Sequence, residues 1–187
     1  LFLNAPSIKS KVNHLDLFSS LVAAAIHDAG HPGVNNGFEI KTDSEKAILY
    51  NDQSVLEMYS LTESFKILKN SKYDIMATMS QEEKRYCRDT IITMVLATDM
   101  ANHVTLLGHF SSGIVTNFNP NSKQDVVNML KMLMKCADIS NPIKPTPIAR
   151  KWAERVMAEF FMQGDREKSL GLAISPLCDR NSSKPGS

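Results

Sequence analysis

Apolar residues recur every three to four positions along most of the chain, which is the spacing of one face of an α-helix. A strand would need alternating apolar and polar residues, and no such stretch of useful length is present. The pattern therefore predicts an all-α fold. The expected helices cover residues 15–27, about 43–50, 52–69, 81–109, 123–139 and 147–163, and the chain becomes loop-like beyond residue 171.

Polar residues ahead of the apolar runs place several helix starts. Ser80 and Glu83 have the spacing of a capping box, in which each side chain accepts the other residue's backbone N–H. We expect this box to open one long helix that runs to about His109. Thr42 or Asp43 is the expected cap of the short helix before residue 50.

Glycine and proline mark where helices stop. Gly30 and Pro32 end the helix over residues 15–27, and the three prolines within 141–147 predict a turn that leads into the last helix. There is no internal repeat and no linker rich enough to divide the chain. We therefore expect one compact multi-helix bundle.

Composition excludes several functional classes. Hydrophobic residues make up 43% of the chain, enough for a globular core, and the net charge is +1. That charge gives no basic field for nucleic acid and no polybasic contact with a membrane. The longest purely apolar run, Leu21–Ile26, is far too short to cross a bilayer, and no signal peptide is evident. Three widely spaced cysteines predict free thiols in a reducing compartment, so a cytoplasmic location is expected.

The strongest chemical signal is the stretch from His27 to Gly33, His-Asp-Ala-Gly-His-Pro-Gly. Imidazole nitrogen suits zinc, and a carboxylate suits magnesium or manganese, so His27 and Asp28 together can serve a site with two metals. His31 follows four residues after His27 and shares its face if the helix persists that far. The alternative is a helix end at which a histidine lies near the negative pole of the macrodipole.

A second signal is Asp138, whose helical neighbours Met134, Leu130 and Val127 are apolar. A carboxylate on an apolar face near a helix C-terminus needs a cation or several donors. A metal would supply the cation, and a structural pairing is the alternative. Glu57 and Asp99 also follow apolar residues; each would orient a ligand or a water molecule, or else lie on a solvated face.

An aromatic and aliphatic stripe, Trp152, Val156 and Phe160, lies along the last helix. Spacing by four is typical of core packing, and such a face can also stack a purine. The lone histidines at positions 14, 103 and 109 are assigned no chemical role.

These pieces, in this order, resemble the class I cyclic-nucleotide phosphodiesterases of eukaryotes, and the resemblance runs along nearly the whole chain. Any one motif is weak evidence, whereas all of them in sequence are specific. The matching segments are Ala25–Asp28 with His31–Gly33, Tyr50–Asp52 with Ser54–Glu57, Leu96–Met100, Cys136–Pro142, Glu159–Phe161 with Gln163–Asp165, and Ser175–Asp179.

The resemblance implies an all-helical fold of the HD-type phosphohydrolase kind. It implies hydrolysis of cyclic AMP, cyclic GMP or both to the 5′-monophosphate, in signal transduction. A zinc ion would be held by His27, Asp28 and Asp138, and Asp28 would bridge to a magnesium or manganese ion. His31 and Glu57 would assist catalysis beside these ligands.

The resemblance also assigns the substrate pocket. Asn141 would face the purine, Val156 and Phe160 would clamp it, and Met100 and Ile139 would lie at the rim. The substrate is then a cyclic nucleotide, nucleic acid and direct membrane contact are not expected, and a homodimer is left open.

The chain differs from the family pattern in the segments it covers and at several single positions. The resemblance implies that the H-N-x-x-H segment, with the proton-donating histidine and another zinc ligand, would fall before residue 1, and that the glutamine that reads the purine would fall after residue 187. Residues 1–187 are therefore expected to be a partial catalytic domain, truncated at both ends and nearly inactive alone. Met58 and Tyr59 follow Glu57 where many members have histidines, and Gly30 stands where an acidic residue is common.

Two other functions remain open. One is a different His-Asp metallophosphohydrolase that acts on a nucleotide mono- or triphosphate. The other is a non-catalytic module that binds a nucleotide or partner subunits without hydrolysis.

Overall fold

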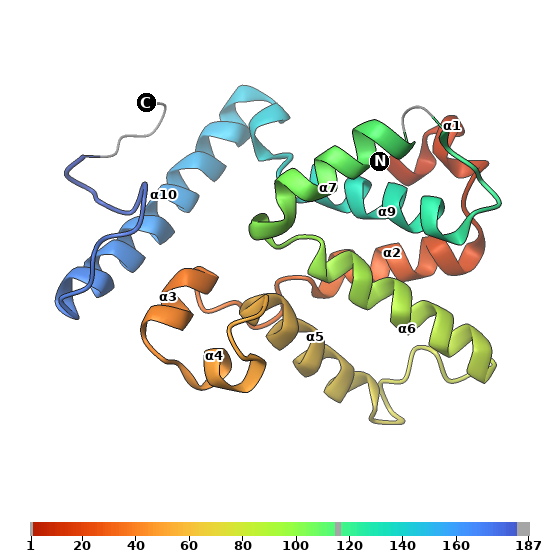
Figure 1. The fold of residues 1–187 in the computed structure, drawn as a ribbon, viewed down its shortest axis with the longest axis horizontal. Coiled ribbons are helices and arrows are strands. Elements are labelled where there is room, and N and C mark those ends of the chain that lie inside the picture. The colour runs from red at the N-terminus through yellow and green to blue at the C-terminus, as the bar shows by residue number, and fades with distance from the viewer. Residues whose placement is uncertain (1, 115–116, 183–187) are drawn as a thin grey trace. The chain divides into compact units, whose positions relative to one another are not determined.

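The computed structural model describes residues 2–114 and 117–182, and these residues contain helices and no β-strand (Figure 1). The predicted all-α fold class is confirmed. The α-helices are α1 (Pro6–Lys9), α2 (His14–Ile26), α3 (Asn36–Lys41), α4 (Glu45–Tyr50), α5 (Val55–Leu68), α6 (Gln81–Leu96), α7 (His103–His109), α9 (Lys123–Asp138) and α10 (Thr146–Ser169). Shorter turns are the 3₁₀ helices η1 (Phe2–Asn4), η2 (Met100–Asn102) and η4 (Asn141–Ile143) and the π-helical turn η3 (Phe110–Ile114).

The chain forms two compact units, each assembled from two separate stretches. The first unit contains the residues up to Gly30 and then Glu57–Asp138, and the second contains His31–Leu56 and the described residues from Ile139 onward. The apolar pattern gave no sign of this division. That residues 1–187 form part of one catalytic domain stays a prediction.

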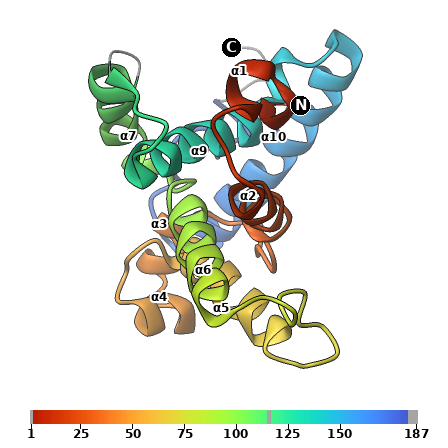
Figure 2. The ribbon, with the colours of Figure 1, turned by 90° about the vertical axis from the view of Figure 1, so that its right-hand side faces the viewer.

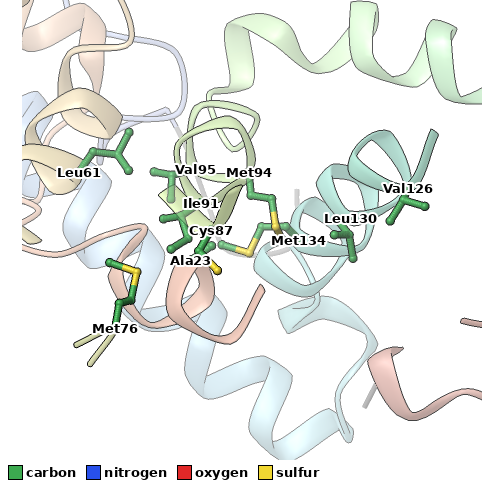
Figure 3. Close-up of a cluster of buried hydrophobic side chains, with 10 residues drawn as sticks. All are labelled: Ala23, Leu61, Met76, Cys87, Ile91, Met94, Val95, Val126, Leu130 and Met134. Carbon is green, nitrogen blue, oxygen red and sulfur yellow. The ribbon is translucent and has the colours of Figure 1, made fainter. Parts of the chain in front are cut away.

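The core of the first unit lies where α2, α6 and α9 pack against one another (Figures 2 and 3). Ala23 of α2, Ile91 and Val95 of α6 and Leu130 of α9 have no exposed surface. Full burial of one valine, leucine or isoleucine side chain stabilises a fold by about 1.5–3 kcal/mol. This shared core holds the C-terminal ends of α2 and α9 within one packed unit, which matters because His27 and Asp138 lie at those ends.

Capping boxes open two of the three core helices. Asn13 and Asp16 exchange side chain–backbone hydrogen bonds of 2.9 Å at the start of α2. The Asp16 carboxylate is 2% exposed and also accepts the Tyr86 hydroxyl at 2.5 Å. At the start of α6, Ser80 and Glu83 form the capping box that the sequence predicted.

The prediction of one helix from Ser80 to about His109 is wrong. α6 ends at Leu96, and the following helical stretch, Met100–Ser112, is turned by 83°. The Asp99 carboxylate accepts the backbone N–H of Ala101 at 2.9 Å and caps η2, which competes with a continuous helix. The apolar spacing continues across the bend, so periodicity alone did not reveal it.

No single helix in the described parts of the chain has both the length and the apolar character needed to span a bilayer. The combination of α6 with Met100–Ser112 passes on length and composition only, and it is bent. Buried core helices pass the same test.

In the second unit, Ser44 caps α4 by accepting the N–H of Ala47 at 3.1 Å. The predicted cap, Thr42 or Asp43, is therefore wrong by one or two residues. Thr42 instead donates its hydroxyl to the carbonyl of Phe38 at 2.9 Å at the end of α3, and Asp43 turns the chain with φ +47°.

The far end of α10 is organised around Glu167, whose side chain has no exposed surface. Its carboxylate accepts the Ser175 N–H at 2.7 Å, the Ser175 hydroxyl at 2.5 Å and the Gln163 amide at 3.1 Å. Gln163 in turn accepts the N–H of Asn35 at 2.8 Å. These contacts carry α10 to Ser169, beyond its predicted end at residue 163, and hold the segment after it.

Candidate metal centre

His27 is the residue that ends α2, where its backbone N–H still bonds the carbonyl of Ala23. Its ring Nδ1 lies 2.9 Å from the carbonyl of Ala24, so Nδ1 carries a proton that this carbonyl accepts. The side chain is 21% exposed, and Nε2 faces two carboxylates. A histidine held in this way at Nδ1 presents Nε2 as a metal ligand does, because the second hydrogen bond fixes the ring.

The two carboxylates come from distant parts of the chain. Nε2 of His27 lies 3.2 Å from Oδ2 of Asp28 and 3.4 Å from Oδ1 of Asp138, at the last residue of α9. One nitrogen and two oxygens from these three residues all lie within 4.8 Å of one another. The convergence of His27, Asp28 and Asp138 is confirmed, and their role as metal ligands stays a prediction.

The electrostatics of this cluster favour a cation between the carboxylates. His27 forms hydrogen bonds with both acids, and these raise the pKa of its imidazole from 6.5 to about 10. The bond to Asp138 has the larger effect and the bond to Asp28 the next, while burial lowers the pKa. A proton on His27 therefore supplies the positive charge that the two acids require. A divalent metal could replace that proton, and the nitrogen and oxygen donors fit zinc, so the residues present suit the ion that the sequence implied.

His31 is not carried on α2. The helix ends at Ile26, and Gly30 turns the chain with φ +74°, so the condition for His31 to share the face of His27 is not met. In the second unit His31 is exposed, and its Nδ1 accepts the N–H of Gly33 at 3.1 Å. Its catalytic role stays a prediction.

Glu57 lies near the start of α5, in the same unit as the cluster. Its charge acts on the ammonium group of Lys135 of α9, as do the charges of Asp99 and Asp138. Sequence reasoning overlooked Lys135, because a lysine is normally assigned to the solvent side of a helix. Its place directly after the buried Met134 was the one available signal.

The predicted substrate residues lie in both units. Met100 is the first residue of η2 in the first unit and is 61% exposed. In the second unit, Ile139, Asn141 and Val156 line one hollow of about 950 Å³ together with Trp152.

Two further observations bear on this hollow. The amide oxygen of Asn141 accepts the Lys144 ammonium, so the amide has a fixed position. Phe160 lies one turn beyond Val156 on α10, is half-buried, and is not among the residues that line the hollow. The structure therefore brings together three of the five predicted substrate residues.

Comparison with known proteins agrees with the family resemblance seen in the sequence. Residues 1–187 match the family described as 3'5'-cyclic nucleotide phosphodiesterase. Over 188 aligned residues, covering 97% of the chain, it is 43% identical to 3',5'-cyclic-AMP phosphodiesterase 4C of Rattus norvegicus and of Mus musculus. It is 39% identical over the same share to 3',5'-cyclic-AMP phosphodiesterase, isoform F, of Drosophila melanogaster.

The chain spans 35%, 27% and 28% of these three relatives, about a third of their length or less. The family match leaves no part of the chain uncovered. The chain belongs to the 3'5'-cyclic nucleotide phosphodiesterase family.

Proposed function

We propose that the protein containing this chain hydrolyses 3',5'-cyclic nucleotides to nucleoside 5'-monophosphates at a centre of two metal ions. The observation that carries the proposal is the convergence of His27, Asp28 and Asp138, the last two separated by 110 residues. Three relatives are named cyclic-AMP phosphodiesterases, which supports cyclic AMP as the first substrate to test.

The donor set supports a choice of ions. The family is metal-dependent. His27, Asp28 and Asp138 would hold zinc, since one imidazole and two carboxylates are common zinc ligands. The exposed Asp28 carboxylate, with 64% of its side chain accessible, has an oxygen that could bridge to magnesium or manganese.

The reaction forms a bond from a water oxygen to phosphorus and breaks the bond between phosphorus and the 3′ oxygen on the opposite side. The water loses a proton, and the departing 3′ oxygen gains one. Bound metals supply two things to this reaction, an acidified water and neutralisation of the phosphate charge. The chain's own residues would hold the metal ions and orient the phosphate and the water. Glu57 would help to fix the cluster from α5, and His31 would act on the approaching phosphate or water.

Residues at and after the end of α9 would hold the base. Asn141, with its amide fixed by Lys144, would face the purine, and Ile139, Val156 and Phe160 would contact its ring. The apolar side chains and the single amide fit a purine, which needs a stacking surface and one or two polar partners.

The test uses the full-length protein. After chelation and addition of zinc with magnesium, the formation of AMP and GMP is measured from the two cyclic nucleotides. Asp138→Asn should lower kcat/KM by more than about 100-fold, because loss of a direct ligand exceeds the 10–100-fold effect of outer partners. The matched control is Asp89→Asn, an exposed carboxylate on α6, which should leave activity unchanged.

Each alternative function gives its own result. If the protein binds zinc but hydrolyses neither cyclic nucleotide, the result would contradict the proposal and favour a non-catalytic module. Release of phosphate from nucleoside mono- or triphosphates instead would favour the other class of His-Asp hydrolase.

A further inference from the structure

Lys135 lies one turn before Asp138 on α9 and is a buried cation, with only 1% of its surface exposed. Its Nζ donates to the backbone carbonyls of Ala97 at 3.3 Å, Thr98 at 3.0 Å and Asp99 at 3.2 Å. An ammonium group has three protons to donate, and three successive carbonyls here accept them. The group is therefore fully paired although it is buried.

These carbonyls lie just past the last residue of α6. The last carbonyls of a helix have no partner within the helix, and they carry the negative end of the macrodipole. From the neighbouring helix α9, Lys135 satisfies the carbonyl of Ala97, the C-cap residue of α6, and bonds the next two carbonyls, at the place where the chain turns by 83°. The contact therefore ties α9 to the bend between α6 and η2.

Lys135 also lies among acids. The carboxylates of Asp138, Asp99 and Glu57 favour its charged form, although burial is the larger effect and leaves the pKa of Lys135 below its ordinary value. Asp138 belongs to the candidate metal centre, and Asp99 caps η2. The charge of this one ammonium group therefore interacts with a carboxylate of the metal centre and with a carboxylate of the bend.

We propose that Lys135 is a positioning residue of the metal centre, which fixes the last turn of α9 so that Asp138 faces His27. The proposal rests on the proposed function, in which His27, Asp28 and Asp138 hold a cation. Residues 135 and 138 are three positions apart and share one helical turn, so anchoring the first restricts the rotation of the second.

The test is the sign of a change in zinc affinity. Lys135→Met keeps the length of the side chain and removes its charge. If Lys135 acted by charge alone, its loss would make the site more negative, and zinc would bind more tightly. If Lys135 positions Asp138, zinc should bind about 10–100-fold more weakly, the usual effect of losing a partner that orients a ligand.

Zinc affinity of the full-length protein is measured by competition with a chromophoric chelator at a temperature where circular dichroism shows each variant folded. The matched control is Lys131→Met, one turn earlier on α9, where Nζ contacts Asn128 at 3.4 Å and not the bend. The control should bind zinc as the wild type does. Equal or tighter binding by Lys135→Met overturns the proposal.

A second measurement needs no variant and decides the matter if Lys135→Met does not fold. Zinc added to the wild type should slow hydrogen exchange of the amides in residues 97–102, because the bend is tied to the turn that carries Asp138. Unchanged exchange there overturns the proposal. A wild type that binds no zinc contradicts the metal centre itself, so failure of the proposed function and failure of the role of Lys135 are distinguishable.

Discussion

Gly164 in α10 lies directly against the segment that follows the helix. A Cβ built at this position would lie 2.0 Å from the carbonyl oxygen of Cys178 and 2.8 Å from its carbonyl carbon. Both are backbone atoms, so no rotation of a side chain can relieve the overlap. Gly164→Ala therefore has to push the segment around Cys178 away from α10.

The cost of Gly164→Ala can be estimated from what the displacement breaks. Overpacking alone costs about 1–3 kcal/mol. The displaced segment contains Ser175, whose bonds of 2.7 and 2.5 Å to the buried Glu167 are each worth about 1.5–3 kcal/mol as bonds to a charged group. Alanine regains about 1 kcal/mol of helix propensity. With one bond lost, the net destabilisation is about 3 kcal/mol.

Thermal unfolding of the full-length protein and hydrogen exchange of residues 172–182 report this effect. Gly108→Ala is the matched control, because Gly108 is also helical and a Cβ there meets nothing within 4 Å. The control should be stabilised by about 0.5–1 kcal/mol. If Gly164→Ala were as stable as the wild type, with unchanged exchange after α10, the close packing of Cys178 on Gly164 would be refuted.

The remaining predictions concern protons. Because the pKa of His27 is raised to about 10, the metal-free protein carries a proton there at pH 7, and zinc must displace it; calorimetry in buffers of different ionisation enthalpy should give about one proton released, and none would contradict the site. The stability that this protonated His27 confers on the metal-free protein is fully present below about pH 6.5 and is lost as pH rises through about 10. Burial and the hydrogen bond to Asp16 raise the pKa of Tyr86 to about 12, so its contribution is complete below about pH 10 and lost through about 12. Absorbance at 295 nm should show one late tyrosine that Tyr86→Phe removes, and an unchanged titration in that variant would contradict the assignment.

The sequence predicted helix ends well where they depend on residues only a few positions apart. The Ser80–Glu83 box and the glycine at position 30 act within a few residues, and both work as expected. The cap of α4 was misplaced because Thr42, Asp43 and Ser44 are three cap-forming residues in a row, and the end of α3 uses the first.

The bend after α6 could not be predicted from local pattern. Apolar spacing continues through it, and its stabilising partner, Lys135, lies more than thirty residues later in the chain. The candidate site shows the same limit. His27 and Asp28 are neighbours and were visible as a pair, whereas bringing Asp138 to them needs the packed core of α2, α6 and α9.

The interleaving of the two units affects how the gene can be dissected. Because the chain changes unit after Gly30, Leu56 and Asp138, no single cut separates the two units from each other. A chain that stops at Asp138 keeps every segment of the first unit but leaves residues 31–56 without the rest of the second. During synthesis those residues leave the ribosome well before α10 does, so the second unit can be completed only after α10 has been made. Loss of activity on truncation would then report an unfinished unit and would not locate the residues that carry out the chemistry.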